Sequence, residues 1–343
     1  MLKIKIPPTS AAAEPPEERG LSRDQTRLMI SFGAKNRITH TKFFEIVDYL
    51  LPGDLLVINS SATIPASLPV KNLAGQKLEL MLSQKILFGL WIAEINKDDQ
   101  DSFPGFQSGE TLALPGGASC VLHLPLNSDY SVNCQLWVVS LNTGPDEVLD
   151  YLARFASPPH FSHHSQHWPL KYFQTVFADE PGSAEMPSAG RGFTPELINK
   201  LLVKGIQIAP LVLHAGANCE GHIPPHEEYY RIPVDTAQAI NRVHTAGGRV
   251  IAVGSTVVRA LDTVTHIHGQ VCPGEGWTKK EIKAGACVSS IDGLLTGLHE
   301  PETTHIDLLQ SFIGQEQLET AYTEALARGY LWHEFGDFHL ILP

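Results

Sequence analysis

Five short apolar runs between residues 66 and 141 constrain the fold more than any other feature of this sequence. Apolar and polar residues alternate within the runs, and Gly, Pro, Asn or Asp separate one run from the next. The runs are KLELMLSQ, LFGLWIAEI, ETLALP, SCVLHLPL and CQLWVVSL. A period of two is typical of half-buried strands, and turn residues at this spacing favour antiparallel neighbours. We therefore expect a small antiparallel barrel or sandwich in this part of the chain.

The chain on either side of these runs has a different pattern. From about residue 146 onward, amphipathic helical segments alternate with short apolar strands. They include PELINKLLVKGI, IAPLVLH, VDTAQAINRVHTAGG, RVIAVGS and TVVRALDTVTHIH. Such alternation favours an α/β layer. The predicted fold class is α/β, a largely parallel sheet with helices over residues 1–65 and 146–343, interrupted by an inserted small antiparallel β-barrel domain over residues 66–145.

Composition and cysteine usage limit the cellular setting. The 343 residues are 43% hydrophobic, and no apolar run reaches the roughly 18 residues that span a bilayer. The N-terminus has no apolar core of signal-peptide length. The five cysteines lack a C-x-x-C spacing, which disfavours a disulfide scaffold or a zinc ribbon. We expect a cytoplasmic monomer that does not associate with membranes.

The net charge of −12 disfavours a general nucleic-acid binder, because phosphate contacts need local Lys and Arg. Only residues 1–60 lack an acidic excess, and Arg19, Arg23 and Arg27 contribute to a basic cluster there. This cluster is either a phosphate-facing patch or a solvated surface.

The strongest local signal for a binding site is the segment RVIAVGSTVVRAL, which begins at Arg249. An apolar strand is followed by Gly254, and Ser255 or Thr256 can cap the next helix. Helix N-termini at strand ends bind anions in α/β folds, and Arg259 lies one turn into this helix. The alternative is an ordinary turn followed by a surface arginine. No G-x-G-x-x-G follows a strand, so a dinucleotide fold is not supported.

Histidines supply the candidate acid–base groups. His214 ends an apolar strand, and His226 follows in a Gly/Pro-rich loop. Either imidazole could act as a general acid or base, since it titrates near neutral pH. The remaining loop histidines match no zinc spacing, so we predict no metal ligand among His160, His163, His164 and His167.

Ten short motifs follow one another along most of the chain. They are Arg23-Asp-x-x-Arg27-Leu, Pro52-Gly-Asp-Leu-Leu-Val-Ile-Asn59, Ile64-Pro-Ala, Phe173-Gln-Thr-Val-Phe-Ala, Pro187-Ser-Ala-Gly-x-x-Phe-Thr, Leu213-His-x-Gly, His226-x-Glu228-Tyr-Tyr, Val253-Gly-Ser-Thr-x-x-Arg, Thr296-x-x-His-x-Pro and Gly336-Asp337. In this order they resemble the motifs of the S-adenosylmethionine:tRNA ribosyltransferase-isomerases of queuosine synthesis. The resemblance implies an α/β catalytic domain with an inserted barrel.

The resemblance also implies the reaction and its residues. S-adenosylmethionine would donate its ribosyl group to a 7-aminomethyl-7-deazaguanine in tRNA, the ribose would isomerise to give epoxyqueuosine, and adenine and methionine would leave. No metal and no separate cofactor are implied. The implied catalytic residues are His214, His226, Arg259 and His299. The implied substrate-binding residues are Asn59, Gln174, Ser188, Gly190, Glu228, Gly254, Ser255, Thr256, Thr296 and Asp337.

Several positions depart from the family pattern. Ala62 and Ser67 stand where the family has arginines, Gly192 replaces a histidine, and the loop around Cys219 differs. Loss of two arginines leaves two alternatives open beside the family reaction. The first is an S-adenosylmethionine-dependent ribosyltransferase or lyase that acts on a small acceptor without tRNA. The second is a catalytically inactive module that binds S-adenosylmethionine.

Overall fold

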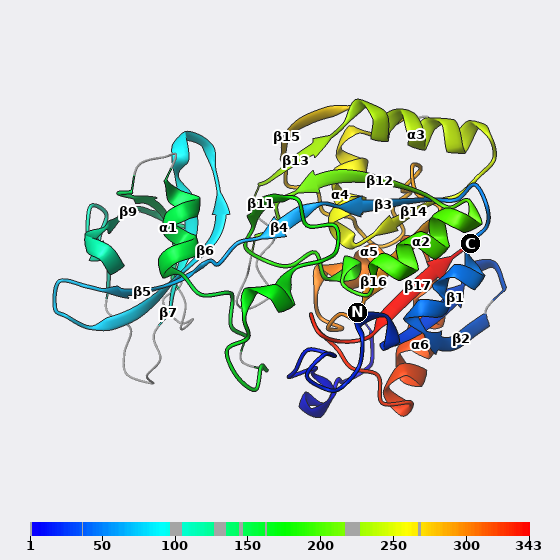
Figure 1. The fold of residues 1–343 in the computed structure, drawn as a ribbon, viewed down its shortest axis with the longest axis horizontal. Coiled ribbons are helices and arrows are strands. Elements are labelled where there is room, and N and C mark those ends of the chain that lie inside the picture. Colours follow the sequence, from blue (N-terminus) through cyan, green and yellow to red (C-terminus); the bar gives the residue numbers. More distant parts are fainter. Residues whose placement is uncertain are drawn as a thin grey trace.

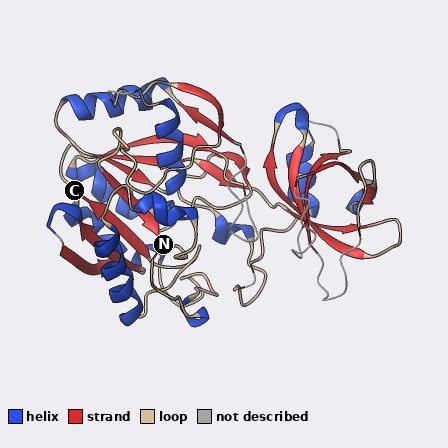
Figure 2. Ribbon diagram, turned by 180° about the vertical axis from the view of Figure 1, so that it is seen from behind, coloured by secondary structure: helices blue, strands red, loops and turns tan. Residues whose placement is uncertain are grey.

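The structure is a computed structural model that describes residues 2–35, 37–96, 105–126, 135–143, 147–161, 163–216, 227–266 and 269–343. Two bodies are visible, a small barrel and a larger α/β body (Figure 1), and the view from behind shows the same division (Figure 2). Within the described residues, no helix is long and apolar enough to cross a membrane.

The larger body is built on a nine-stranded sheet. Its order is β15 (Gly274–Thr278), β13 (Glu228–Ile232), β12 (Gln207–Leu213), β3 (Leu55–Asn59), β14 (Val250–Val253), β16 (Gly293–Gly297), β17 (Phe338–Leu342), β1 (Arg27–Phe32) and β2 (Arg37–Lys42). The α-helices are α1 (Val148–Phe155), α2 (Pro195–Lys204), α3 (Val234–Thr245), α4 (Ser255–Val264), α5 (Thr304–Leu309) and α6 (Gln315–Ala327). The 3₁₀ segments are η1 (Pro8–Ser10), η2 (Arg23–Gln25), η3 (Gly33–Lys35), η4 (Phe43–Tyr49), η5 (Leu87–Gly89), η6 (Pro115–Gly117), η7 (Leu170–Phe173) and η8 (Ser188–Gly190).

The α/β class is confirmed, but the expectation of a largely parallel sheet is not. Parallel pairs join β12 to β3, β3 to β14, β14 to β16 and β17 to β1. The other four pairs, β15–β13, β13–β12, β16–β17 and β1–β2, are antiparallel. β1 and β2 are antiparallel because the short connection through η3 reverses the chain. β16 and β17 are antiparallel although α5 and α6 lie between them.

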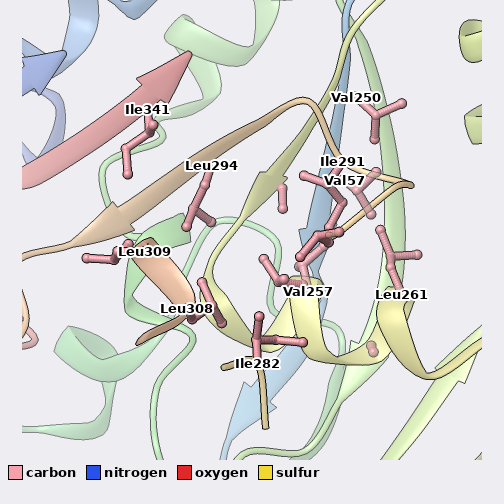
Figure 3. Packing of buried hydrophobic residues seen from close by; sticks show 14 of the residues in the cluster. Val57, Val250, Val257, Leu261, Ile282, Ile291, Leu294, Leu308, Leu309 and Ile341 are labelled. Carbon is pink, nitrogen blue, oxygen red and sulfur yellow. The ribbon is translucent and has the colours of Figure 1, made fainter. Parts of the chain in front are cut away.

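The sequence of β3, LLVIN, is almost continuously apolar because both faces of this strand are covered. Leu55 and Val57 face one layer, which contains α3, α4 and α6, whereas Leu56 and Ile58 face the layer of η4 and α2. A strand covered on both faces has no solvent side to carry polar residues. Figure 3 shows the first of these layers, in which Val57 lies close to Val257 of α4.

The smaller body is a closed six-stranded antiparallel barrel. Its order is β10 (Gln135–Leu141), β7 (Trp91–Asn96), β6 (Lys77–Lys85), β5 (Ser67–Lys71), β8 (Thr111–Ala113) and β9 (Ser119–Pro125). The expected barrel is therefore confirmed. Leu152 of α1 packs into the barrel core and closes it. The proposed division of the chain at residues 65 and 146 stays a prediction.

A two-stranded parallel pair, β4 (Ser61–Thr63) and β11 (Glu180–Ser183), lies in the connection between the bodies (Figure 1). The first strand leads into the barrel and the second belongs to the return chain. The two segments that connect the bodies are thus paired with each other.

Candidate functional site

The candidate site is a cavity of about 1220 Å³ lined by both bodies. Its α/β wall contains the β14–α4 turn and the end of β16, and its barrel wall contains Ser83 and Gln84 of β6. Ligands in α/β proteins bind beyond the carboxyl ends of parallel strands, and β14 and β16 present such ends here. Eight predicted site residues line the cavity: Ser188, Glu228, Gly254, Ser255, Thr256, Arg259, Thr296 and His299.

The turn from β14 into α4 requires glycine. Gly254 has φ of 103° and ψ of 150°, and a Cβ there would lie 3.4 Å from the Ala189 Cβ. L-residues rarely adopt this backbone conformation. Gly254 is also the N-cap, with no side-chain cap, so the suggestion that Ser255 or Thr256 caps α4 is wrong. The first turn of α4 instead presents small residues to the cavity.

Arg259 and Glu228 form a buried ion pair at the cavity wall. The Arg259 Nη2 lies 2.5 Å from the Glu228 Oε2, and their side chains are 12% and 5% exposed. Arg259 Nε donates to the Lys280 carbonyl at 2.9 Å, and Glu228 accepts from the Gly216 amide at 3.2 Å. Burial raises the pKa of Glu228, and the Arg259 charge opposes that rise. Arg259 is not the surface arginine of the alternative interpretation.

Glu185 is a cavity residue that sequence reasoning missed. Burial first, and then the nearby Glu334 and Glu228 carboxylates, raise the pKa of Glu185 to about 8, while Arg259 opposes the rise. The carboxyl group is therefore mostly protonated at neutral pH. The one signal in the sequence is a charged residue just before the loop that begins at Pro187. That signal alone does not distinguish a cavity residue from a surface one.

His299 follows β16 and lines the cavity with a neutral imidazole. Its Nε2 lies 2.8 Å from the Thr296 Oγ1, and its ring stacks on His305 with centroids 4.2 Å apart. Burial is the main cause that keeps the pKa of His299 well below its usual value, and it lowers the pKa of His305 to about 4. The Thr-x-x-His spacing thus brings the two side chains together.

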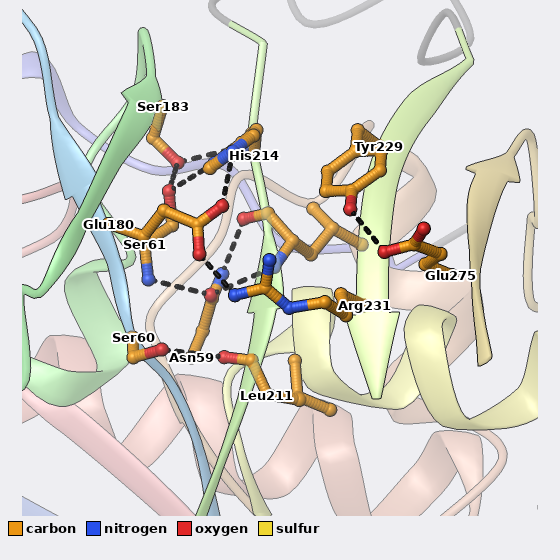
Figure 4. Close-up of polar contacts among 12 residues, drawn as sticks. Asn59, Ser60, Ser61, Glu180, Ser183, Leu211, His214, Tyr229, Arg231 and Glu275 are labelled. Carbon is orange, nitrogen blue, oxygen red and sulfur yellow. Dashed lines mark hydrogen bonds and ion pairs between the residues drawn. The ribbon is translucent and has the colours of Figure 1, made fainter. Parts of the chain in front are cut away.

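His214 belongs to a different polar cluster, which Figure 4 shows, and it is not among the residues that line the cavity. Its Nδ1 lies 2.8 Å from the Ser61 Oγ, and its Nε2 lies 3.7 Å from the Glu180 Oε1. Glu180 also pairs with Arg231. Burial lowers the pKa of His214.

Asn59 joins three elements rather than facing the cavity. Its Nδ2 donates to the Leu213 carbonyl at 2.8 Å and to the Thr256 Oγ1 at 3.3 Å, and its Oδ1 accepts from the Leu213 amide at 3.0 Å. Asn59 therefore positions the start of α4 relative to β3 and β12.

Three other predicted residues do not line the described cavity, and two of them hold the backbone. Gln174 bonds the amide and carbonyl of Thr63, and Asp337 accepts from the Arg27 and Leu331 amides. Gly190 lies in η8, where a Cβ would pack against Phe177. His226 lies outside the described residues.

The departures from the family motifs are buried positions. Ala62 and Ser67 are 8% and 6% exposed. A Cβ at Gly192 would lie 2.8 Å from the Phe43 ring, so Phe43 fills the space that a side chain would need. The loop around Cys219 lies outside the described residues.

Comparisons with known proteins agree with this architecture. The family model described as queuosine biosynthesis protein matches residues 2–341. The S-adenosylmethionine:tRNA ribosyltransferase-isomerase of Thermotoga maritima is 34% identical over 98% of each chain, and that of Desulfitobacterium hafniense is 34% identical over 99% of this chain and 98% of its own. The crystal structure of S-adenosylmethionine tRNA ribosyltransferase from Thermotoga maritima superposes with a TM-score of 0.55 at 29% identity over 99% of both chains.

The match of the family model over nearly every residue, together with relatives of the same length, identifies the family without reference to any single motif. This chain belongs to the queuosine biosynthesis protein family.

Proposed function

We propose that this protein is an S-adenosylmethionine:tRNA ribosyltransferase-isomerase. It would transfer and isomerise the ribosyl group of S-adenosylmethionine onto a 7-aminomethyl-7-deazaguanine in tRNA, giving epoxyqueuosine and releasing adenine and methionine. One observation carries this proposal: relatives with that name are 34% identical over nearly the whole chain.

The buried Arg259–Glu228 pair supports a role in binding the donor. The methionyl end of S-adenosylmethionine is a zwitterion, so its carboxylate would bind Arg259 and its ammonium would bind Glu228. The first turn of α4 adds backbone N–H groups at a helix N-terminus, which favour an anion. A cavity wall without charged residues would offer no partner to the carboxylate or to the ammonium, whereas Arg259 and Glu228 offer one to each.

We assign proton transfer to the cavity residues His299 and Glu185 rather than to His214. The sulfonium acidifies the neighbouring 5′ carbon, so an adjacent base could begin the reaction. His214 points its ring at Ser61 and Glu180 and does not line the cavity. The pKa of Glu185, at about 8, is closer to neutral pH than that of His299, and such a value suits proton transfer.

The test is incubation with S-adenosylmethionine in the presence and absence of tRNA that carries 7-aminomethyl-7-deazaguanine. Mass spectrometry should detect adenine, methionine and the modified nucleoside only with the tRNA. Absence of all three products with active substrate tRNA would contradict the proposal, and binding of S-adenosylmethionine without product would support the inactive module.

The charge of the cavity favours a second candidate, turnover on a small acceptor without RNA. Among the described lining residues the acidic side chains outnumber the basic ones. The acidic residues are Glu94, Glu185, Glu228, Glu281, Glu300, Glu302 and Glu334, and the basic ones are Lys5, Arg259 and Lys280. Such a lining suits a cationic sulfonium but repels phosphates. Release of adenine and methionine without RNA would favour this candidate.

We further propose that the enzyme acts as a monomer in the cytoplasm. The cytoplasmic part is supported by Cys120, Cys272 and Cys287, which are free thiols, as a reducing compartment allows.

A further inference from the structure

Two loops far apart in the sequence bring a histidine pair and a carboxylate together beside the cavity. His163 and His164 lie between α1 and η7, and Glu334 lies between α6 and β17. One ligand atom from each of the three lies within 4.8 Å of the others. His163 and Glu334 also line the cavity. The contacts among these three residues are independent of whether the protein catalyses the proposed reaction.

His164 is the unusual member of this group. Its residue is 7% exposed and its side chain fully buried, yet neither ring nitrogen has a hydrogen-bond partner among the described residues. The rings of Phe335 and Phe173 pack against it with centroids 5.0 and 5.8 Å away. Buried polar groups are almost always satisfied, so a buried imidazole without a hydrogen bond requires an explanation.

The distances are close to those of a metal centre. His163 Nε2 lies 2.9 Å from the Glu334 Oε2, and His164 Nε2 lies 3.7 Å from the same oxygen. Ligand atoms about 2.1 Å from a tetrahedral ion lie about 3.4 Å apart, between these two values. Small side-chain rotations would therefore bring all three atoms to one ion. A simple His163–Glu334 hydrogen bond would leave His164 unexplained.

We propose that His163, His164 and Glu334 bind a divalent transition-metal ion, for which Zn²⁺ is the probe. Two imidazoles and one carboxylate are a donor set that zinc accepts at catalytic sites, with further positions left for water or substrate. Because His163 and Glu334 line the cavity, those open positions would face it. The ring of His333 stacks on His163 with centroids 4.2 Å apart and restrains its orientation. This proposal differs from the expectation of no metal ligand among these histidines, and the experiment below decides between the two.

The proposal is tested on the full-length protein after treatment with a chelator. Zn²⁺ binding is measured by calorimetry, and Co²⁺ is added as a substitute whose visible absorption reports ligand geometry. The variants are His164→Gln and Glu334→Gln, and the control is His167→Gln, which changes an exposed histidine of the same segment. Circular dichroism checks that each variant is folded.

The wild-type protein and the control should bind Zn²⁺ in a one-to-one complex, and Co²⁺ should give intense d–d bands. Each ligand variant should lose more than about 100-fold in affinity, because even groups outside the ligand set change metal affinity by about 10–100-fold. If the His164→Gln protein does not fold, the Zn²⁺ affinity of the Glu334→Gln protein decides whether the proposal holds. Equal Zn²⁺ affinity in a folded variant and the wild type, or no specific binding by the wild type, would overturn the proposal whatever the outcome of the tRNA assay.

Discussion

At the scale of single residues, the site combines buried charges with neutral imidazoles. Arg259 and Glu228 neutralise each other, while Glu185 is pushed toward its uncharged form by burial and by neighbouring carboxylates. His299 and His305 stack and stay neutral. The acidic excess of the cavity lining therefore comes from its other glutamates.

The role assigned to Arg259 predicts a loss of donor binding. Replacing Arg259 by Ala removes the partner of the methionyl carboxylate and leaves Glu228 buried and unpaired, so affinity for S-adenosylmethionine should fall by about 100-fold or more. Arg242→Ala, at an exposed position of α3, is the control and should bind as the wild type does. Calorimetric titration gives both values. Unchanged affinity in the Arg259 variant would refute the placement of the carboxylate.

The raised pKa of Glu185 predicts that binding of S-adenosylmethionine is coupled to release of a proton. Its pKa of about 8 means that most of the carboxyl is protonated at pH 7.5, and a bound sulfonium would favour the carboxylate. Binding should therefore release a fraction of a proton near pH 7.5, and Glu185→Gln should remove that release. Calorimetry of the chelator-treated protein in buffers of different ionisation enthalpy measures it. Equal proton release by both proteins counts against the role of Glu185.

At the scale of elements, the β14–α4 turn connects the core to the site. Val253 is buried in the sheet, Gly254 reverses the path, and Val257 returns to the core on α4. Asn59 holds the same turn through Thr256. The position of the helix start thus depends on packing and on hydrogen bonds from a neighbouring strand.

Substitution of the turn glycine should affect stability and binding together. Gly254→Ala places a Cβ in a backbone region that only glycine occupies readily, which costs about 1–3 kcal/mol. The melting temperature should fall and affinity for S-adenosylmethionine should decrease. Gly274→Ala is a suitable control because its φ is ordinary and a Cβ there would meet no atom within 4 Å. Similar melting temperatures for the two variants would show that the strain is absent.

At the scale of the whole molecule, two bodies share one cavity, and β17 carries a buried neutral histidine. His339 in β17 is fully buried, with its Nε2 2.9 Å from the Ser31 Oγ, and burial lowers the pKa of His339 to about 3. In the unfolded chain this imidazole would titrate near its ordinary value of about 6.5.

This difference predicts sensitivity to acid. Below about pH 6.5 the unfolded state binds a proton that the folded state does not, so folding stability is lost as the pH falls toward 3. The contribution of His339 is about 1.4 kcal/mol per pH unit in that window. Chemical unfolding between pH 7 and pH 4 should show a shallower loss for His339→Gln than for the wild type. Parallel curves for the two proteins would exclude His339 as the cause.

Local sequence patterns predicted the elements well where one periodicity dominates. The five alternating runs became barrel strands β6 to β10, and PELINKLLVKGI became α2, which Thr194 begins by accepting from the Leu197 amide. The Val253-Gly-Ser-Thr motif correctly placed a helix start beside a cavity. These features depend on residues close in sequence, whose hydrophobic spacing and turn chemistry act locally.

Contacts between distant residues were decided by the tertiary structure alone. His163 and Glu334 are 171 positions apart, and no periodicity relates them. His214 follows its strand as expected, yet packing turns it toward Ser61 and away from the cavity-lining set. The sequence by itself determined the two-part architecture, because local hydrophobic patterns differ between the two parts. It also determined the family, because the ordered motifs can be recognised without a structure. Strand direction, the burial of Arg259 and the His163–His164–Glu334 group arose only when long-range packing brought separate segments together.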